Sequence, residues 1–367
     1  MGGVREDGGE WTHTPRGRRE LGMFEKLAVL GTGAIGSIIG AYLTRAGRDI
    51  ALIDMWPAHV EQMRRGGLKV TAVDAEEFQT PVTAVHLGEV AALRTRFDAV
   101  FLAVKSYDTA WAATFIAPYL NPHGVVVSAQ NSINEDQLGA VLRFPRILGC
   151  VATLGAGLYE PGHVTRTTPP SRPPFTVGEV TGLASPRAKV IAELLSAVGP
   201  TKVTCNLWGE RWSKLTTNSM LNALASITLM NNAELRQAPE VFDITVQIAG
   251  EAIMVAQALG VHVEPINGID PALYLDAARG KGLEVLRTKW VEGGRSVGAG
   301  RPSLLQDVLK GRRTEIDYLN GLVARKGREV GIPTPMNDVV ITVTKQVESG
   351  EIKPGPENLK LFTGARS

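Results

Sequence analysis

The first half of the chain carries its hydrophobic positions in short continuous runs, each followed by residues with helical spacing. Buried strands are predicted at 26–30, 49–54, 97–106, 124–132 and 146–154, because each run is apolar and bounded by polar residues or glycine. Strands that are apolar on both faces are typical of parallel sheets covered by helices on both sides. The alternation of strands and helices therefore predicts an α/β fold with an open, doubly wound sheet of the Rossmann type.

The pattern changes after residue 154. Residues 155–180 include the proline-rich stretch TTPPSRPP, which excludes a helix or central strand there, and short strands are predicted on either side of it, at 162–167 and 175–180. A helix near 185–198 and a strand at 201–206 follow. Beyond them, a glycine-rich loop is expected at 291–303, and apolar positions with helical spacing predict helices at 209–230, 239–259, 271–278, 303–329 and 336–348.

These patterns divide the chain into three parts. Residues 1–22 contain charge and glycine without an apolar run, so they are predicted to form a disordered extension rather than a signal peptide. Residues 23–206 are predicted to form the Rossmann-type domain. Residues 207–367 are predicted to form an all-α domain that binds substrate and mediates a homodimer.

Composition narrows the class of protein. The 367 residues are 44% hydrophobic and carry a formal net charge of only +2, which gives no indication of a nucleic-acid partner or an anionic membrane surface. No apolar run approaches the roughly 20 residues that span a bilayer. The two cysteines are far apart and match no metal-binding spacing. We therefore expect a cytoplasmic protein with no metal, no membrane and no nucleic-acid partner.

A glycine turn follows the first predicted strand. The sequence GTGAIG places Gly31, Gly33 and Gly36 in the GxGxxG spacing, with Ala34 and Ile35 opening the next helix. In such turns the first glycine allows a tight bend, the second lets backbone approach a pyrophosphate, and the third lets the helix pack on the strand. Because the hexapeptide follows a strand and opens a helix, these five residues are predicted to bind a dinucleotide.

Asp54 ends the second predicted strand, where an acid commonly accepts hydrogen bonds from the adenine ribose. A carboxylate there would repel a 2′-phosphate, so NAD is favoured over NADP, with NADP possible. The alternative is that Asp54 only caps the helix that starts at Pro57.

A lysine and two asparagines recur every four residues along one predicted helix. Lys214, Asn218 and Asn222 fall within about 80° of one another on a face bordered by apolar residues. A lysine that lines a cleft loses solvation, which lowers its pKa and suits it to donate a proton to a developing alkoxide. The alternatives are a surface stripe and a buried network that only satisfies its own hydrogen bonds.

Further polar residues stand at the ends of predicted elements. Lys105 and Asn131 end two strands of the sheet, and ligands of open α/β sheets gather at such carboxyl ends. Ser303 stands at the start of a predicted helix, where it is either a carboxylate partner or a plain N-cap. Glu315 is predicted to lie in the middle of that helix, where the alternative is an ordinary exposed carboxylate, and Asp307 is equally explained as structural.

Taken together, these clusters resemble the ketopantoate reductase (2-dehydropantoate 2-reductase) family over nearly the whole predicted fold. The matching stretches are GTGAIG, AVKSYD, AQNSIN, RWSKLTTNSMLNAL, PSLLQDVLKGRRTEIDYLNG and GIPTPMND. The glycine turn occurs in many families. The lysine–asparagine helix together with the serine and glutamate segment is specific to this one.

The resemblance implies a hydride transfer between a nicotinamide dinucleotide and a ketone or secondary alcohol, without a metal. Lys214 is implied as the general acid, and Glu315 as a carboxylate near the substrate and the lysine. The residues implied to bind a small-molecule substrate are Asn218, Asn222, Ser303 and Asn131. Lys105 and Asn131 are implied to lie around the nicotinamide ribose.

Three features depart from the family. Its pantoate-forming members mostly use NADPH, whereas Asp54 indicates NAD, and Gly300 falls where they tend to have an asparagine. The proline-rich loop and the segment at 271–300 are also more elaborate. An NAD enzyme that oxidises a different, larger secondary alcohol in catabolism is therefore an alternative to pantoate formation. A non-catalytic dinucleotide sensor and an amine-forming, opine-type dehydrogenase are further alternatives.

Overall fold

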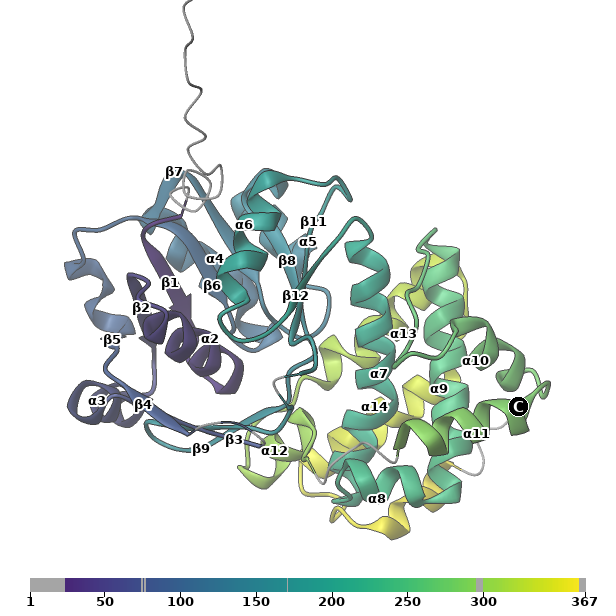
Figure 1. The fold of residues 1–367 in the computed structure, drawn as a ribbon. Coiled ribbons are helices and arrows are strands. Elements are labelled where there is room, and N and C mark those ends of the chain that lie inside the picture. The colour runs from purple at the N-terminus through teal and green to yellow at the C-terminus, as the bar shows by residue number, and fades with distance from the viewer. Residues whose placement is uncertain (1–23, 74, 76, 170, 295–299, 363–367) are drawn as a thin grey trace, which may run out of the picture.

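A sheet domain and a helical domain lie side by side in the computed structural model, on the left and right of Figure 1. The structure describes residues 24–73, 75, 77–169, 171–294 and 300–362. The predicted extension at 1–22 and part of the predicted glycine-rich loop lie outside these described residues.

The main sheet has eight strands in the order β12-β11-β8-β7-β6-β1-β2-β5, and all neighbours are parallel except β8 and β11. Its central strands are almost completely buried, as their continuous apolar runs predict. The strands are β1 (Leu27–Leu30), β2 (Ile50–Asp54), β5 (Thr83–His86), β6 (Phe97–Leu102), β7 (Leu120–Ser128), β8 (Ile147–Ala152), β11 (Phe175–Glu179) and β12 (Thr201–Thr204).

Helices cover both faces of this sheet, which confirms the doubly wound prediction. One apolar core joins the sheet to α2 (Ala34–Arg45), α3 (Pro57–Gly66) and α6 (Pro186–Leu195). A second core joins the opposite face to α4 (Thr109–Ile116) and α5 (Glu135–Leu142).

A second, four-stranded sheet packs against α2, and most of it was not predicted. Its order is β4-β3-β10-β9, and only β10 matches a predicted strand. The other strands are short and carry polar residues, so neither a continuous apolar run nor a long alternation marks them. The strands are β3 (Leu68–Ala72), β4 (Phe78–Thr80), β9 (Ala156–Glu160) and β10 (His163–Arg166).

The helical domain begins at α7 and has one large apolar core. The helix α9 is long and apolar enough to cross a membrane, but 72% of that stretch is buried inside the fold, which makes it a core helix. The helices are α7 (Leu207–Thr228), α8 (Asn232–Gln237), α9 (Pro239–Ala258), α10 (Pro271–Ala278), α11 (Leu283–Gly294), α12 (Ser303–Leu309), α13 (Asn320–Val330) and α14 (Pro335–Glu348). Short 3-10 turns occur at Leu87–Ala92, Ser106–Asp108, Ala117–Tyr119, Phe144–Arg146, Ile316–Tyr318 and Pro356–Phe362.

Two predictions about the helical domain are wrong. The single helix expected at 303–329 is two helices, because α12 ends at Leu309 and Gly311 follows in the left-handed region with φ +61°. Glu315 therefore lies in the connection between α12 and α13 and not in the middle of a helix. The loop expected from residue 291 starts later, because α11 continues to Gly294.

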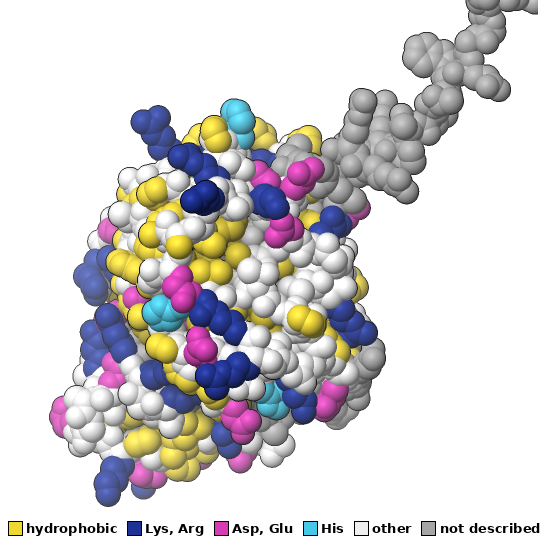
Figure 2. All heavy atoms as spheres, turned by 90° about the vertical axis from the view of Figure 1, so that its left-hand side faces the viewer, with side chains coloured by type: hydrophobic (Ala, Val, Ile, Leu, Met, Phe, Trp, Pro, Cys, Tyr) yellow, Lys and Arg dark blue, Asp and Glu magenta, His cyan; other side chains and the backbone are white. Residues whose placement is uncertain are grey.

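Charges of both signs are interspersed on the face of the sheet domain shown in Figure 2, with hydrophobic side chains among them. This mixture is ordinary for a protein surface, because apolar atoms make up more than half of it. The face in view carries no continuous field of positive charge of the kind that attracts a phosphate backbone.

A buried arginine of α7 ties the helical domain to the sheet. Arg211, which is 2% exposed, donates from Nη1 to the Gln130 carbonyl and from Nη2 to the Ser128 carbonyl, both at 2.8 Å. Its Nε donates to Oε1 of the fully buried Glu135 at 2.9 Å, and Nη2 donates to the same oxygen. These bonds hold the start of α7 in one position relative to the end of β7 and the segment that follows it.

We expect Arg211→Met to lower the free energy of unfolding by about 3–5 kcal/mol, because it leaves the Glu135 carboxylate buried without its cation. Urea unfolding followed by circular dichroism measures the change. Lys26→Met is the control, since the Lys26–Asp49 ion pair is exposed to solvent and we expect a much smaller change. Equal effects of the two substitutions would contradict this role for Arg211.

Candidate active site

A cleft of about 890 Å³ lies between the two domains. The sheet domain contributes the glycine turn and the carboxyl ends of its strands, and the helical domain contributes α7, α8 and the segment around α12. Every residue predicted from the sequence to act in the site except the buried Gly36 lines this cleft: Gly31, Gly33, Ala34, Ile35, Asp54, Lys105, Asn131, Lys214, Asn218, Asn222, Ser303 and Glu315.

The glycine turn has the geometry that its spacing predicts. Gly31 has φ +90°, and a Cβ there would lie 2.8 Å from the Val104 backbone nitrogen. A Cβ on Gly36 would lie 2.1 Å from the Gly31 carbonyl oxygen, so only glycine lets α2 pack this closely. A Cβ on Gly33 would meet nothing within 4 Å, because Gly33 faces the open cleft.

The first turn of α2 is open to a negatively charged ligand. Gly33 is the N-cap and supplies no side chain to bond the free N–H groups, and Ala34 and Ile35 line the cleft just after it. The partial positive charge of a helix N-terminus favours phosphate at such a position. The open space in front of Gly33 and these uncapped N–H groups fit the pyrophosphate of a dinucleotide.

Asp54 holds the glycine turn through hydrogen bonds to Thr32. Its Oδ2 accepts hydrogen bonds from the Thr32 backbone N–H at 2.6 Å and from the Thr32 hydroxyl at 2.8 Å. Its Oδ1 accepts from the Trp56 backbone N–H at 2.8 Å, and α3 begins at the next residue. Asp54 therefore supports the glycine turn and the residue before α3, and it also lines the cleft. The structural role and the predicted ligand-binding role are compatible with each other.

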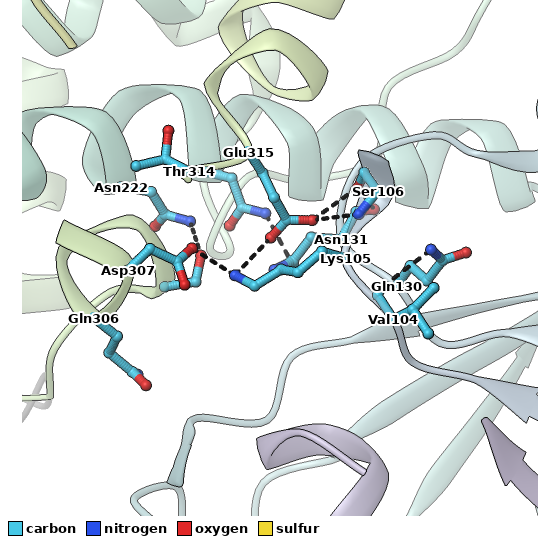
Figure 3. Close-up of polar contacts among 12 residues, drawn as sticks. Val104, Lys105, Ser106, Gln130, Asn131, Asn222, Gln306, Asp307, Thr314 and Glu315 are labelled. Atoms are coloured by element: carbon cyan, nitrogen blue, oxygen red, sulfur yellow. Dashed lines mark hydrogen bonds and ion pairs between the residues drawn. The ribbon is translucent and has the colours of Figure 1, made fainter. Parts of the chain in front are cut away.

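Lys105 joins the two domains by two ion pairs. Its Nζ lies 2.5 Å from Asp307 Oδ2 and 3.1 Å from Glu315 Oε2, and both carboxylates are nearly fully buried (Figure 3). Burial opposes a charge on the ammonium, but Glu315 and Asp307 outweigh it and raise the pKa of Lys105 above its usual range. Lys105 is therefore a fixed cation at neutral pH.

The second oxygen of Glu315 binds the loop that carries Lys105. Glu315 Oε1 accepts from the Ser106 backbone N–H at 2.9 Å and from the Ser106 hydroxyl at 2.8 Å. Ser106 and Asp307 were not among the predicted site residues. Nothing in their local sequence could have marked them, because their partners stand about 200 positions away.

Lys214 stands in contrast to Lys105. The side chain is half-buried on α7, and among the described residues no carboxylate stabilises its charge. Burial alone therefore acts on it and lowers the pKa of Lys214 to about 8. An ammonium with this pKa gives up a proton far more readily at neutral pH than an ordinary lysine does.

The asparagines of α7 pair with the predicted substrate-binding residues. Asn218 Nδ2 lies 3.4 Å from Asn131 Oδ1, and Asn222 Nδ2 donates to Ser303 Oγ at 3.1 Å. Ser303 is the first residue of α12, where its hydroxyl caps no backbone N–H. This geometry leaves the Ser303 hydroxyl available to a ligand.

Sequence comparisons identify a family on both domains. The model described as ketopantoate reductase PanE/ApbA matches residues 27–181, and the model of the C-terminal domain of that family matches residues 206–348. The chain belongs to the ketopantoate reductase PanE/ApbA family. It is thus a member of a family of NAD(P)-dependent oxidoreductases, with the family's parallel-sheet α/β domain followed by a helical domain.

Individual relatives cover nearly the whole fold. The 2-dehydropantoate 2-reductase of Archaeoglobus fulgidus is 29% identical over 329 residues, which are 89% of this chain and 99% of the relative. The structure of a PanE/ApbA family ketopantoate reductase from Ralstonia eutropha is 28% identical, with a TM-score of 0.72 over 89% of this chain and 99% of that one. The structure of D-mandelate dehydrogenase with NADH and anilino(oxo)acetate is 25% identical, with a TM-score of 0.76 and the same coverage.

We expect Gly33→Val to weaken dinucleotide binding at least about tenfold, because the new side chain enters the open space in front of α2. Titration of NADH fluorescence with purified protein measures the dissociation constant. Gly33 has φ −63°, outside the left-handed region that favours glycine, so we expect the variant to fold, which circular dichroism checks. An unchanged dissociation constant would contradict the predicted pyrophosphate position.

Proposed function

We propose that this chain interconverts a 2-oxo acid and the corresponding 2-hydroxy acid, with Lys214 as the general acid and base. The observation that carries the proposal is Lys214 itself. It is a lysine of lowered pKa without a counter-charge among the described residues, and it lines the same cleft as the glycine turn and the Asn222–Ser303 pair.

In the reduction, the Lys214 ammonium donates a proton from Nζ to the substrate carbonyl oxygen and stabilises the alkoxide that would otherwise form there. The bound dinucleotide supplies the hydride in this direction and accepts it in the other. In the oxidation, neutral Lys214 removes the hydroxyl proton. No metal is needed for either direction.

The other residues bind and orient. The Ser303 hydroxyl, held by Asn222, donates to the substrate carboxylate, while Asn218 and Asn131 fix the orientation of the carbonyl. Glu315 and Asp307 hold the Lys105 ammonium at the sheet edge, where it would bind the nicotinamide ribose. Glu315 thus acts near the substrate by fixing Lys105 and Ser106.

Lys214 makes the two directions of the reaction depend oppositely on pH. Its ammonium is present below a pH of about 8 and is lost as pH rises through that value. We expect kcat for reduction to fall above pH 8 and kcat for oxidation to rise through the same range. Rates recorded between pH 6 and 10 in both directions check this, and profiles with the same sign would contradict it.

Substitution of Lys214 tests the same role independently. We expect Lys214→Met to lower kcat by at least about 100-fold, because the proton donor is lost. Binding of NADH, measured by fluorescence, should persist. Lys326→Met, a surface substitution on α13, is the matched control. Full turnover by Lys214→Met would refute the mechanism and leave the dinucleotide-sensing alternative.

We propose NAD rather than NADP as the cofactor, because the Asp54 carboxylate at the end of β2 repels a 2′-phosphate. We expect kcat/KM to be at least about tenfold higher with NADH than with NADPH, and Asp54→Asn to shift that ratio toward NADPH. The ratio is independent of how much active protein each preparation holds. A wild-type preference for NADPH would refute the assignment.

Two substrates remain in competition within this proposal. Membership of the family supports reduction of 2-dehydropantoate, while the likeness to D-mandelate dehydrogenase with NADH supports oxidation of a larger 2-hydroxy acid. Gly300 favours the larger substrate, because glycine takes less room in the cleft than the asparagine that pantoate-forming members tend to have at this position. We also propose that the enzyme is a cytoplasmic homodimer. Light scattering after gel filtration tests the oligomeric state.

A further inference from the structure

Arg236 is a further half-buried cation of the cleft, besides Lys105, Lys214 and Lys310. Arg236 lies on α8, one helical turn after Asn232, and both residues line the cleft. The helix is firmly anchored, because the Asn231 side chain accepts hydrogen bonds from the backbone N–H groups of Ala233 and Glu234. The Asn232 backbone N–H also donates to the Gly300 carbonyl at 3.2 Å. The position of Arg236 is therefore set by the fold.

The guanidinium of Arg236 is packed but poorly hydrogen-bonded. It lies over the Trp290 ring at 4.3 Å from the centroid, and its Nη1 makes one long hydrogen bond of 3.4 Å to the Trp290 carbonyl. Within the described part of the chain its Nε is buried without an acceptor, and no carboxylate forms an ion pair with it. Apart from the Nη1 bond to the Trp290 carbonyl, the donors of its two terminal nitrogens therefore have no acceptor among the described residues.

No acid that lines the cleft is directed at this arginine. Asp54 is bound by Thr32, Asp307 and Glu315 hold Lys105, and the charges that act on Asp108 are those of Arg313 and Glu315. Burial lowers the pKa of Arg236, and the Tyr274 hydroxyl is the one group in the described structure that opposes this effect. A partly buried guanidinium without a counter-charge is costly unless a ligand supplies the charge.

Arg236 lies beyond the predicted substrate-binding residues, on the side away from Lys214. Lys214 and Asn222 are separated by two turns of α7, or about 12 Å along the axis, and the chain enters α8 only after α7 has ended. Asn232, Gly300 and Thr167 line the cleft, and a Cβ on Gly300 would already be in van der Waals contact with Asn232 Nδ2 at 3.7 Å and Thr167 Oγ1 at 3.8 Å. The cleft as a whole, at about 890 Å³, is far larger than a simple 2-oxo acid, so a longer substrate has room to extend toward Arg236.

We infer that Arg236 binds a second carboxylate at the far end of the substrate, so that the enzyme prefers dicarboxylic 2-oxo or 2-hydroxy acids. This inference rests on the proposed function. The carboxylate next to the reacting carbon binds Ser303, and the distal carboxylate binds the guanidinium, which favours carboxylates through parallel N–H donors. The part of the cleft lined by Asn232, Gly300 and Thr167 takes the connecting methylene groups.

The test compares substrates of equal chain length with and without the second carboxylate. Purified full-length protein and NADH are assayed with 2-oxoglutarate against 2-oxopentanoate, and with 2-oxoadipate against 2-oxohexanoate. We expect kcat/KM to be at least tenfold higher for the dicarboxylate in at least one pair. Equal values, or a preference for the monocarboxylate in both pairs, would overturn the inference.

Substitutions then test whether Arg236 causes the preference for the dicarboxylate. We expect Arg236→Met to reduce the ratio of the two kcat/KM values at least tenfold, mainly through KM, and Arg236→Lys to restore part of it. Arg287→Met is the matched control, because Arg287 lies over the Phe242 ring at the same 4.3 Å but outside the cleft. An unchanged ratio in Arg236→Met would overturn the inference.

A second variant covers the case in which Arg236→Met does not fold. Gly300→Val narrows the space in front of Arg236 without removing the cation, and we expect it to lower the same ratio. The same ratio in Gly300→Val as in the wild type would count against the inference. Two other results would refute the proposed function itself. One is that the protein reduces none of these four acids and does not reduce 2-dehydropantoate, and the other is that Lys214→Met retains turnover.

Discussion

The arrangement of the cleft depends on the buried guanidinium of Arg211. Its donors bind the Ser128 carbonyl at the end of β7, the Gln130 carbonyl in the loop that follows, and the Glu135 carboxylate, so the start of α7 has one position relative to the sheet. Asn131 follows one of these carbonyls directly, and Lys214 stands one turn after Arg211 on the same helix. Glu135 neutralises the charge of Arg211 inside the protein. The contact therefore fixes the position of α7 without placing a further charge in the cleft.

The cations of the cleft are distinguished by their partners. Lys105 has two carboxylates and stays charged, whereas Lys214 has none among the described residues and titrates near neutral pH. Two lysines some 110 positions apart thus differ in their chemistry because of the acids placed around them. Arg236 has no acid partner in the described structure either, but a guanidinium does not release its proton in this range, so its remaining role is to bind an anion.

Local patterns in the sequence account for much of the fold and for the residues that line the cleft. The apolar runs locate the central strands, the glycine spacing locates the turn, and the four-residue recurrence of Lys214, Asn218 and Asn222 locates one wall of the cleft. These features are local, since each depends on residues within one or two turns of one another. The family resemblance supplied the link between the two domains.

Features that depend on distant partners escaped prediction. In the small sheet, β3 and β10 pair residues about 90 positions apart. The break at Gly311 depends on a backbone conformation that the helical spacing of its neighbours conceals. Ser106 is prominent only because Glu315 approaches it from the other domain. Arg211 stands in a predicted helix, but its importance comes from Glu135, which is 76 positions away.

The bonds of Lys105 and Ser106 to Glu315 and Asp307 also mean that neither domain contains a complete site. In our proposal the sheet domain holds the residues that select the cofactor, and the helical domain holds those that bind the substrate, with Asn131 of the sheet domain as the exception. Exchange of the helical domain between relatives would therefore transfer much of the substrate choice while cofactor choice is retained, provided that Arg211 and the contacts of Lys105 and Ser106 are kept.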